Sequence, residues 1–498
     1  MIGVVDSIAE EAIARLAAQG VAVRRIACDS RRVGPGDVFM AWPGARHDAR
    51  NYIIDAVGRG ASGVIWEARA YRFPAALRVA NVGVEDLQRH AGEIAHLVYG
   101  KPSEAMRLIG ITGTNGKTSC SHWLADALAA SGERCAVVGT LGNGLPGRLA
   151  GSANTTPDAI TLHALLAEWQ RDSIAACAME VSSIGLDQHR LSGARFDTAV
   201  FTNLTHDHLD YHGDMDAYAA AKARLFDWPD LRAAVLNLDD PFGVDLAERS
   251  GAPIKIGYTL TGKSAPGLSA IVAARDVHAT PTGTAFTLAC GEDSQRVVVP
   301  LIGRHNVQNL LAVAGALLVG DYGIERIAAL LPLLKAPPGR LQTLGGSGVP
   351  LVVIDYAHTP DALRNVLEAL RPVAESRGGR LIAVFGCGGN RDKGKRPQMG
   401  EIAARLADRV WLTSDNPRHE EPLAIIADIS AGVLAAGVKP TVDADRAHAV
   451  RTAIAAADAR DVVLLAGKGH EAYQEIAGER LPYSDAITAQ RSLARELP

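Results

Sequence analysis

The stretch LIGITGTNGKTSCSHW, residues 108–123, decides how the rest of the sequence is interpreted. It is typical of an apolar strand, a loop of small residues and the start of a helix. In the phosphate-binding spacing G-x-x-x-x-G-K-[ST] the first glycine would stand where this chain has Ile111, and Gly110 lies one residue too early. Backbone N–H groups at the start of a helix attract phosphate. We therefore expect a nucleotide-binding loop of variant spacing.

The loop supplies the residue types that a phosphate group needs. Lys117 would neutralise the phosphate oxygens, and the Thr118 hydroxyl would bind Mg²⁺. The alternative is an ordinary glycine-rich turn with an exposed lysine, but the strand before the loop and the helix after it favour phosphate binding. The predicted nucleotide contacts are Gly113, Thr114, Asn115, Gly116, Lys117 and Thr118.

Composition excludes several classes of protein. The 498 residues are 48% hydrophobic and 21% charged, and the net charge of −4 gives no basic field for nucleic acid or an anionic membrane. The six cysteines are scattered without a C-x-x-C pair, which indicates a reducing compartment. The N-terminus has early acidic residues, unlike a signal peptide, and the apolar run 310–320 is too short to span a bilayer. We expect a cytoplasmic protein without membrane insertion.

Short strands alternate with helical patterns along the chain, which predicts an α/β fold. Breaks at YGKPSE (99–104) and at the proline-rich LKAPPGRLQ near residue 335 suggest three domains: 1–103, 104–335 and 336–498. In the last segment at least four strands end in polar or glycine-rich residues. Ligands collect at the carboxyl ends of parallel strands, so these ends are candidate walls of a site.

Metal ligands are expected near the nucleotide loop. The apolar strand IAACAMEVSS (174–183) carries Glu180 at its end, where a carboxylate can hold Mg²⁺ directly or through water. The alternative is a solvated glutamate at a strand end. The histidines and aspartates within 206–210 suggest zinc at first, but neither a cysteine nor an H-E-x-x-H spacing supports it.

The segment that follows places a lysine on an apolar helix face. There Lys222 should either extend its charge to water or have that charge altered by burial. Without other information the first alternative is the more common. The stripe consists of Met215, Tyr218, Lys222, Leu225 and Phe226.

Seven motifs together resemble the Mur ligases, in the same order and over nearly the whole chain. They are GITGTNGKT, MEVSS, DHLDYHGDM with the following Tyr, Lys and Leu-Phe, GRHNVQN, PPGR, DYAHTPDAL and GCGGNRDKGKR. The variant phosphate loop is this family's own form. The resemblance implies an N-terminal α/β domain for the uridine end of a substrate, a central ATPase-like domain with a parallel sheet, and a Rossmann-like C-terminal domain.

The resemblance also implies the catalytic centre. Lys222 would be carbamylated, which turns a buried ammonium into an anion that helps to hold Mg²⁺, and two Mg²⁺ ions are expected. Asn306 would contact adenine, and Arg340 and Asp355 would lie near the phosphates and ribose. The expected metal positions are Thr118, Glu180, His208 and carbamylated Lys222, and the expected catalytic residues are Lys117, Glu180, His208 and Lys222.

A UDP-N-acetylmuramoyl-L-Ala-D-Glu substrate is implied by the NTTP and SSIGLDQHR motifs. From the residues alone, NTTP could equally be a polar turn that caps the following helix. In the same way, Arg190 could be an ordinary surface charge. The contacts implied by the resemblance are Ser30, Asn154, Thr155, Thr156, Ser182, Gln188 and Arg190.

The stretch SDNPRHEEP (414–422) points to the amino acid that is added. In the family, D-N-P-R is the form of members that add meso-diaminopimelate. A guanidinium can grip the far carboxylate of that amino acid in a bidentate manner, whereas lysine would leave Arg418 unpaired. The alternative is a capped loop. The implied contacts are Arg391, Asp415, Asn416, Pro417, Arg418, Gly467 and Glu471.

The expected reaction transfers the γ-phosphoryl group of ATP to the D-glutamyl γ-carboxylate, and the amine of diaminopimelate then attacks the acyl phosphate. Three alternatives are a lysine-adding ligase, the more distant folylpolyglutamate synthetase, and a nucleotide-dependent switch. We expect a monomer. One departure from the family is Gln342, where a glutamate near Arg340 is expected.

Overall fold

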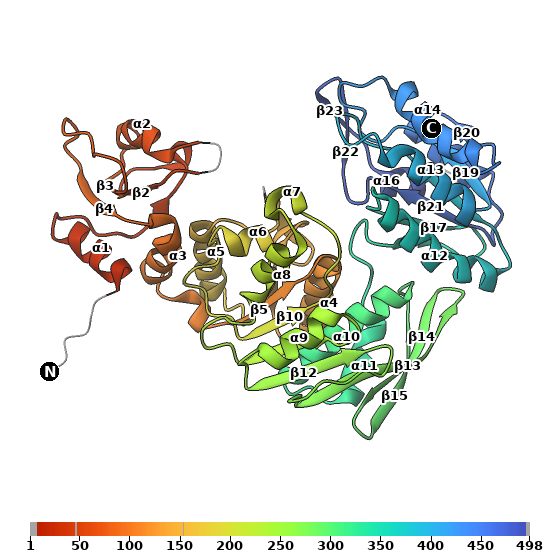
Figure 1. The fold of residues 1–498 in the computed structure, drawn as a ribbon, viewed down its shortest axis with the longest axis horizontal. Coiled ribbons are helices and arrows are strands. Elements are labelled where there is room, and N and C mark those ends of the chain that lie inside the picture. Colours follow the sequence, from red (N-terminus) through yellow and green to blue (C-terminus); the bar gives the residue numbers. More distant parts are fainter. Residues whose placement is uncertain (1–6, 45–46, 153, 495–498) are drawn as a thin grey trace. The chain divides into compact units, whose positions relative to one another are not determined.

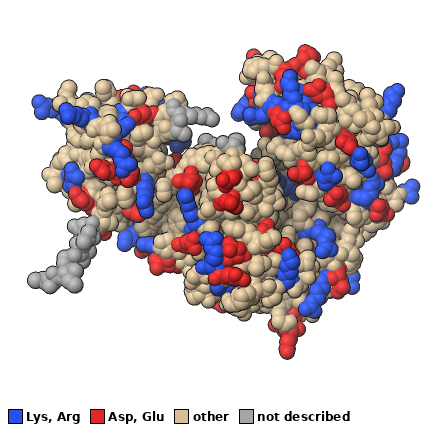
Figure 2. Space-filling view, in the orientation of Figure 1, with Lys and Arg blue, Asp and Glu red and all other residues tan. Residues whose placement is uncertain are grey.

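The computed structural model describes residues 7–44, 47–152 and 154–494 of the chain. It forms two compact units, one of residues 1–271 with 315–321 and the other of residues 272–314 with 322–498. Figure 1 labels many of the helices and strands of each unit. On the face shown in Figure 2, acidic and basic side chains are interspersed, in agreement with the small net charge.

The first unit begins with a four-stranded parallel sheet of order β1-β2-β3-β4. Two helices, α1 and α3, pack on one face through a buried apolar cluster. A capping box between Ser7 and Glu10 starts α1. The elements are α1 (Ile8–Ala17), β1 (Ile26–Ala27), η1 (Ser30–Arg32), β2 (Val38–Ala41), η2 (Ala49–Tyr52), α2 (Ile53–Gly58), β3 (Gly63–Glu67), β4 (Ala80–Val84), α3 (Leu87–Val98) and η3 (Pro102–Glu104).

A larger sheet follows, with the strand order β12-β11-β10-β5-β9-β6-β7-β8 in this unit. Strand β5 pairs in parallel with β9 and β10, so the chain leaves β5 where the strand order reverses. The strands are β5 (Arg107–Thr112), β6 (Cys135–Gly139), β7 (Gly142–Leu145), β8 (Arg148–Ala150), β9 (Ala176–Glu180), β10 (Thr198–Phe201), β11 (Ala233–Asn237) and β12 (Ile254–Thr259), and the helices are α4 (Lys117–Ala130), α5 (Ala159–Arg171), α6 (Ser183–Asp187), α7 (Leu209–His212), α8 (Met215–Ala223) and α9 (Pro241–Arg249).

The second unit holds a six-stranded sheet of order β16-β17-β21-β18-β19-β20. Alternate residues of its central strands pack against α12, α13 and α14 on one face and against α15 and α16 on the other. The elements are β16 (Gln342–Gly345), β17 (Leu351–Asp355), α12 (Pro360–Arg377), β18 (Leu381–Phe385), α13 (Lys395–Leu406), β19 (Arg409–Leu412), α14 (Pro422–Ala435), β20 (Thr441–Val442), α15 (Arg446–Ala455), β21 (Val462–Ala466), β22 (Tyr473–Ile476), β23 (Glu479–Pro482) and α16 (Asp485–Leu493).

Between β12 and β16 the chain forms a group of antiparallel strands, two α-helices and a short 3-10 helix. They are β13 (Ala270–Thr280), β14 (Gly283–Cys290), β15 (Asp293–Val299), α10 (Arg304–Val319), α11 (Ile324–Leu330) and η4 (Leu331–Leu333). The predicted α/β class with parallel sheets is confirmed. The boundaries at 103 and 335 stay predictions. Among the described helices, none has both the length and the apolar character needed to cross a membrane.

Helices α3 and α5 of the first unit meet through two histidines. His163 is fully buried, and its Nε2 lies 2.9 Å from the Ser192 carbonyl oxygen. The His96 ring lies 5.2 Å from that of His163. Burial lowers the pKa of His163 to about 4, so the neutral imidazole is the form that this packing requires.

Acid should destabilise the fold through His163. Its pKa of about 4 lies below the usual 6.5, so the unfolded chain takes up the proton first and stability is lost as the pH falls from 6.5 towards 4. We expect this residue to account for about 2 kcal/mol between about pH 8 and pH 5 in urea unfolding. In His163→Gln, which keeps a donor but does not titrate, the loss should shrink by that amount. An equal pH dependence in both proteins would contradict this prediction.

Candidate functional site

The loop after β5 explains the irregular glycine spacing. Gly110 lies within the strand, where a Cβ atom would stand 2.8 Å from the Phe196 ring, so it is a packing glycine. The loop begins at Gly113, whose φ is +145° and where a Cβ would lie 1.9 Å from Thr202 Oγ1. Gly116, with φ +88°, precedes the first residue of α4. Both loop glycines are therefore required by the backbone, and the helix N-terminus follows them directly.

The segment after β10 holds the loop in place. The Thr114 N–H donates to the Asn203 carbonyl at 2.7 Å, and the Asn115 N–H donates to Asn203 Oδ1 at 2.9 Å. Lys117 Nζ donates to the carbonyl oxygens of Gly113 at 2.7 Å and Thr114 at 2.8 Å. The lysine thus lies over the loop that is predicted to receive phosphate. The sequence reading did not identify the role of Asn203.

Glu180 ends β9 beside this loop and is buried. Its Oε2 accepts hydrogen bonds from the hydroxyls of Thr118 at 3.0 Å and Thr140 at 3.1 Å, and its Oε1 accepts from the Thr140 N–H at 2.8 Å. Gly139 is needed here, because a Cβ would lie 2.1 Å from Glu180 Oε1. The structure therefore brings Thr118 and Glu180 together, as expected. Because Glu180 is buried, the alternative of a solvated glutamate at a strand end is wrong.

Thr140 was not predicted from the sequence to belong to the site, but it contacts two residues that were. Its hydroxyl lies 3.1 Å from that of Thr155 and also donates to Glu180. It directly follows β6, which pairs with β9, so it lies at the same edge of the sheet as Glu180. Its position at a strand end was the available signal.

Lys222 lies on α8 with 1% exposure, which rules out the alternative of a charge extended to water. Its Nζ donates to the Gly113 carbonyl at 2.9 Å and stands 4.4 Å from the centre of the Tyr218 ring. Burial, and secondly the charge of Lys117, hold the pKa of Lys222 well below its usual range. The neutral amine is the form that this environment favours.

His208 is less closely connected to the other metal candidates. Its side chain is about half exposed, lies 3.6 Å from the Asp207 carboxylate and is linked to Lys222 through Tyr218, whose ring centre is 6.1 Å from that of His208. Among the described residues no group of three or more His, Cys, Asp or Glu is arranged so that it could hold a metal ion. The Thr118 and Glu180 oxygens do fit Mg²⁺, which takes one or two carboxylates and completes its shell with water and phosphate.

The predicted substrate residues of the first unit form one network. The Thr156 hydroxyl donates to the Glu180 carbonyl at 2.9 Å and lies 3.0 Å from Ser182 Oγ. Arg190 donates to the Thr156 carbonyl at 2.9 Å and to Gln188 Oε1 at 2.6 Å, so it is not a free surface charge. The network ends at the strand that carries Glu180.

Three predicted contacts flank this network. Asp158, and not the NTTP turn, caps α5, and its carboxylate lies 3.6 Å from the sulfur of Cys28. Ser30, two residues after Cys28, is a buried residue at the start of η1. Asn154 is exposed, and its carbonyl accepts from Ser152 Oγ at 2.7 Å. Thr155 joins the site through Thr140.

The second unit gathers the predicted amino-acid contacts at the ends of β19 and β21. Asn416 Nδ2 donates to Glu471 Oε2 at 2.8 Å, and Arg418 Nη1 donates to the Gly389 carbonyl at 2.8 Å. Arg418 has φ +52°, a left-handed conformation that is uncommon for a side chain of this size. A Cβ on Gly467 would lie 2.4 Å from Asp415 Oδ2.

The remaining members of this set lie around the same loops. Pro417 is buried, and Arg391 is exposed. A Cβ on Gly388 would stand 3.0 Å from Arg418 Nη1 and 3.7 Å from Arg391 Cγ, so the two arginines approach the same backbone position. The first residue of α14 is Pro422, and the cap before it is Glu421, so the alternative of a capping Asp-Asn-Pro-Arg loop is wrong.

The expected adenine and phosphate contacts of the second unit stay predictions. Asn306 is buried and donates to the Ile302 carbonyl at 2.9 Å. Asp355 accepts from the N–H groups of Leu341 and Ala357, both at 2.8 Å, and burial raises its pKa. The Arg340 guanidinium lies 5.4 Å from the centre of the Tyr356 ring.

Gln342 does not pair with Arg340. Its Oε1 accepts from the Gly339 N–H at 3.0 Å.

Two family models match most of the chain. The model of the Mur ligase middle domain matches residues 111–317, and that of the Mur ligase glutamate ligase domain matches residues 339–469. The chain belongs to the Mur ligase family. The resemblance of its motifs to the Mur ligases is confirmed, and enzymes of this family are ligases.

Similar members cover almost the whole chain. The UDP-N-acetylmuramoyl-L-alanyl-D-glutamate–2,6-diaminopimelate ligase of Ectopseudomonas mendocina (strain ymp) is 51% identical over 96% of both chains. The enzyme of the same name from Janthinobacterium sp. (strain Marseille) is 49% identical over 94% of both. A solved Mur ligase structure of that name is 36% identical, covers 95% of both chains and has a TM-score of 0.71.

Thr140 offers a test of the Mur ligase site. Thr140→Val removes the hydroxyl that joins Glu180 and Thr155, and we expect turnover of ATP to fall about tenfold or more, because a hydrogen bond to a charged group is worth about 1.5–3 kcal/mol. Thr140→Ser keeps the hydroxyl and serves as the control. Steady-state kinetics on both variants, checked for folding by circular dichroism, measure the effect. Equal turnover by the two variants would show that the hydroxyl does not matter.

Proposed function

We propose that this chain joins meso-2,6-diaminopimelate to the D-glutamyl γ-carboxylate of UDP-N-acetylmuramoyl-L-Ala-D-Glu, with ATP converted to ADP and phosphate. The observation that carries the choice of amino acid is Arg418, whose side chain is 22% exposed and lies 3.4 Å from the Glu475 carboxylate. It follows Asn416 in the same loop, and Asn416 in turn donates to Glu471. A guanidinium binds the far carboxylate of diaminopimelate in a bidentate manner, and Glu471 binds an ammonium. Relatives that share about half of the sequence carry this activity in their names.

The reaction proceeds in two balanced steps. A γ-carboxylate oxygen attacks the γ-phosphorus of ATP, ADP leaves, and an acyl phosphate remains. The neutral amine of diaminopimelate then attacks the acyl carbon, phosphate leaves, and the amine loses a proton. The protein positions the reactants and stabilises the charge that develops, with Lys117 at the transferring phosphoryl group.

The nucleotide contacts are those predicted from the sequence. Asn306 contacts adenine, and Arg340 and Asp355 lie near the phosphates and ribose. Mg²⁺, two ions in this proposal, supplies charge neutralisation when bound, and its ligands are Thr118, Glu180, His208 and Lys222. The support is the Thr118–Glu180 pair beside the loop of residues 113–118.

Lys222 takes part in this proposal as a carbamate. A neutral amine attacks CO₂, forms an N–C bond and releases a proton, so the product is an anion. The low pKa of buried Lys222 keeps the amine in the reactive form. The carbamate also relieves the repulsion between Lys222 and Lys117, which share the Gly113 carbonyl.

The enzyme is proposed to act as a monomer in the cytoplasm, without nucleic acid or membrane insertion. All six cysteines of the chain are free thiols, which suits a reducing compartment. The nucleotide-sugar peptide is proposed to contact Ser30, Asn154, Thr155, Thr156, Ser182, Gln188 and Arg190, and diaminopimelate to contact Arg391, Asp415, Asn416, Pro417, Arg418, Gly467 and Glu471.

The assay for this function offers the purified enzyme ATP, Mg²⁺ and the UDP-muramoyl dipeptide with one amino acid at a time. Phosphate release should require diaminopimelate, and Arg418→Ala should lower kcat/KM for diaminopimelate about 100-fold, since a site built for a polar group loses strongly when that contact is removed. Arg409→Ala, an exposed arginine on β19, is the matched control.

The same assay separates the alternatives. Release with L-lysine but not with diaminopimelate would identify a lysine-adding ligase. Release with a folate and glutamate in place of both substrates would identify folylpolyglutamate synthetase. Release without any amino acid would favour a nucleotide switch.

Lys222 is tested by chemical rescue. Lys222→Ala should lose nearly all turnover, because both the carbamate and the amine are gone. Short carboxylic acids or bicarbonate should restore part of the activity by placing an anion in the space that the lysine leaves. Kinetics over a range of acetate concentrations, with Lys255→Ala as a control without rescue, measure this. Full activity of Lys222→Ala without added acid would contradict the proposal.

A further inference from the structure

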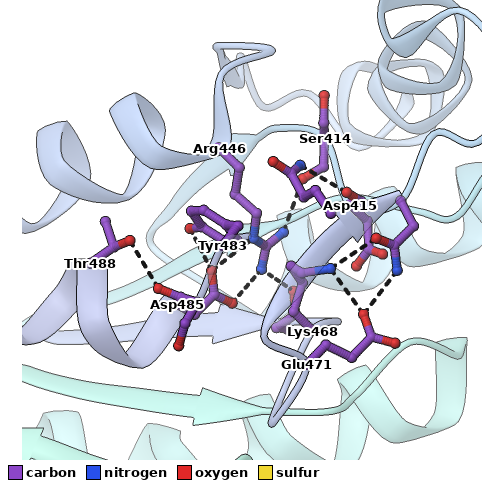
Figure 3. A network of polar contacts seen from close by, with 12 residues as sticks. Ser414, Asp415, Arg446, Lys468, Glu471, Tyr483, Asp485 and Thr488 are labelled. Carbon is purple, nitrogen blue, oxygen red and sulfur yellow. Dashed lines mark hydrogen bonds and ion pairs between the residues drawn. The ribbon is translucent and has the colours of Figure 1, made fainter. Parts of the chain in front are cut away.

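A second buried lysine lies among the loops of the second unit. Lys468 follows β21 in the sequence GKGHE and has no exposed surface. Its Nζ donates to Asn416 Oδ1 at 3.0 Å and to Glu471 Oε2 at 2.9 Å, as part of the network in Figure 3. The Tyr473 ring lies 5.6 Å from the same nitrogen. The ammonium therefore has acceptors on two separate loops.

Glu471 is fixed on one of its two oxygens. Oε2 accepts from both Lys468 and Asn416, at 2.9 and 2.8 Å. Within the described residues no hydrogen bond to Oε1 is present, and the side chain is 17% exposed. A glutamate loses considerable rotamer freedom when it is ordered. Here the hydrogen bonds from Lys468 and Asn416 already order the side chain without a ligand. Oε1 thus remains for a ligand.

The contacts of Lys468 extend towards Arg418 through Asn416. Asn416 Oδ1, which accepts from Lys468, also accepts from the Glu475 N–H at 2.9 Å. The Glu475 carboxylate in turn lies 3.4 Å from Arg418 Nε, and the Glu475 carbonyl accepts from the Arg418 N–H at 2.9 Å. One ammonium is therefore connected to both groups that are proposed to grip the amino acid.

The backbone of the same loops has its own anchor, Arg446. This fully buried guanidinium donates to the Ser414 carbonyl at 3.2 Å and to the Ala466 carbonyl at 2.9 Å, and it forms two bonds with Asp485 (Figure 3). Those carbonyls stand just after β19 and at the end of β21. Because the backbone is held in this way, loss of Lys468 should affect the side chains of the site more than the path of the loops.

We propose that Lys468 is a positioning residue for the incoming amino acid. It aligns Glu471 for an ammonium and, through Asn416 and Glu475, Arg418 for the far carboxylate, so that recognition depends on a lysine that does not itself touch the ligand. This inference depends on the proposed addition of diaminopimelate. Removal of a residue that orients ligand-binding side chains in this way typically changes affinity or activity about 10–100-fold.

The test is the steady-state kinetics of Lys468→Met in the full-length chain, because methionine keeps much of the volume and removes the charge and the donors. The KM for diaminopimelate should rise about tenfold or more, while the KM values for ATP and the UDP-muramoyl dipeptide stay within about twofold. The preference for diaminopimelate over L-lysine should fall about tenfold. Lys439→Met, at an exposed lysine of the same unit, is the matched control and should match the wild type.

A purely structural role gives a different pattern. If Lys468→Met lowered kcat but left every KM and the amino-acid preference unchanged, the positioning role would be overturned. If this variant did not fold, Lys468→Gln would be measured in its place, with the same rise in KM expected and an unchanged KM again overturning the inference. A wild-type enzyme that turned over another amino acid but not diaminopimelate would instead overturn the proposed function.

Discussion

The carbonyl oxygen of Gly113 accepts hydrogen bonds from two lysines, Lys117 and Lys222, and the site of the first unit depends on this arrangement. Two ammonium groups at one oxygen repel each other, and Lys222 is also removed from water. The cost is reduced if Lys222 gives up its proton and if anions lie nearby. The phosphate and the Lys222 carbamate of the proposed function would both supply such an anion. The repulsion between the two lysine ammonium groups therefore favours the binding of anionic groups at this site.

Strand ends place the other groups of the site. The loops after β5, β6, β9 and β10 reach the same edge of the parallel part of one sheet, where Thr140 and Glu180 meet the nucleotide loop. In the second unit the ends of β19 and β21 are joined through Arg446. In both units the rigid sheet sets the position, and short polar side chains or a buried cation complete it.

Much of this was predictable from the sequence because the relevant residues sit in strong local patterns. The loop after β5 stands out by its spacing alone, whereas Glu180 and Lys222 became site candidates over their alternatives only through the resemblance to the Mur ligases. Thr140 did not stand out, since a threonine after a strand has no charge to mark it. Lys468 was also missed, because a lysine between two glycines resembles an exposed loop charge and its burial depends on β22 and on Asn416. Tertiary contacts of this kind leave no periodic trace in a single sequence.

At Arg418 the side chain proposed to bind the ligand stands in an unfavourable backbone conformation. Its φ of +52° suits glycine or asparagine better than a long side chain. A replacement that relaxed the backbone would remove the guanidinium that the proposed function assigns to the far carboxylate of the amino acid. Under the proposed function, a substitution that lowers the backbone strain at this position also weakens binding of the amino acid, so stability and recognition cannot both be improved there.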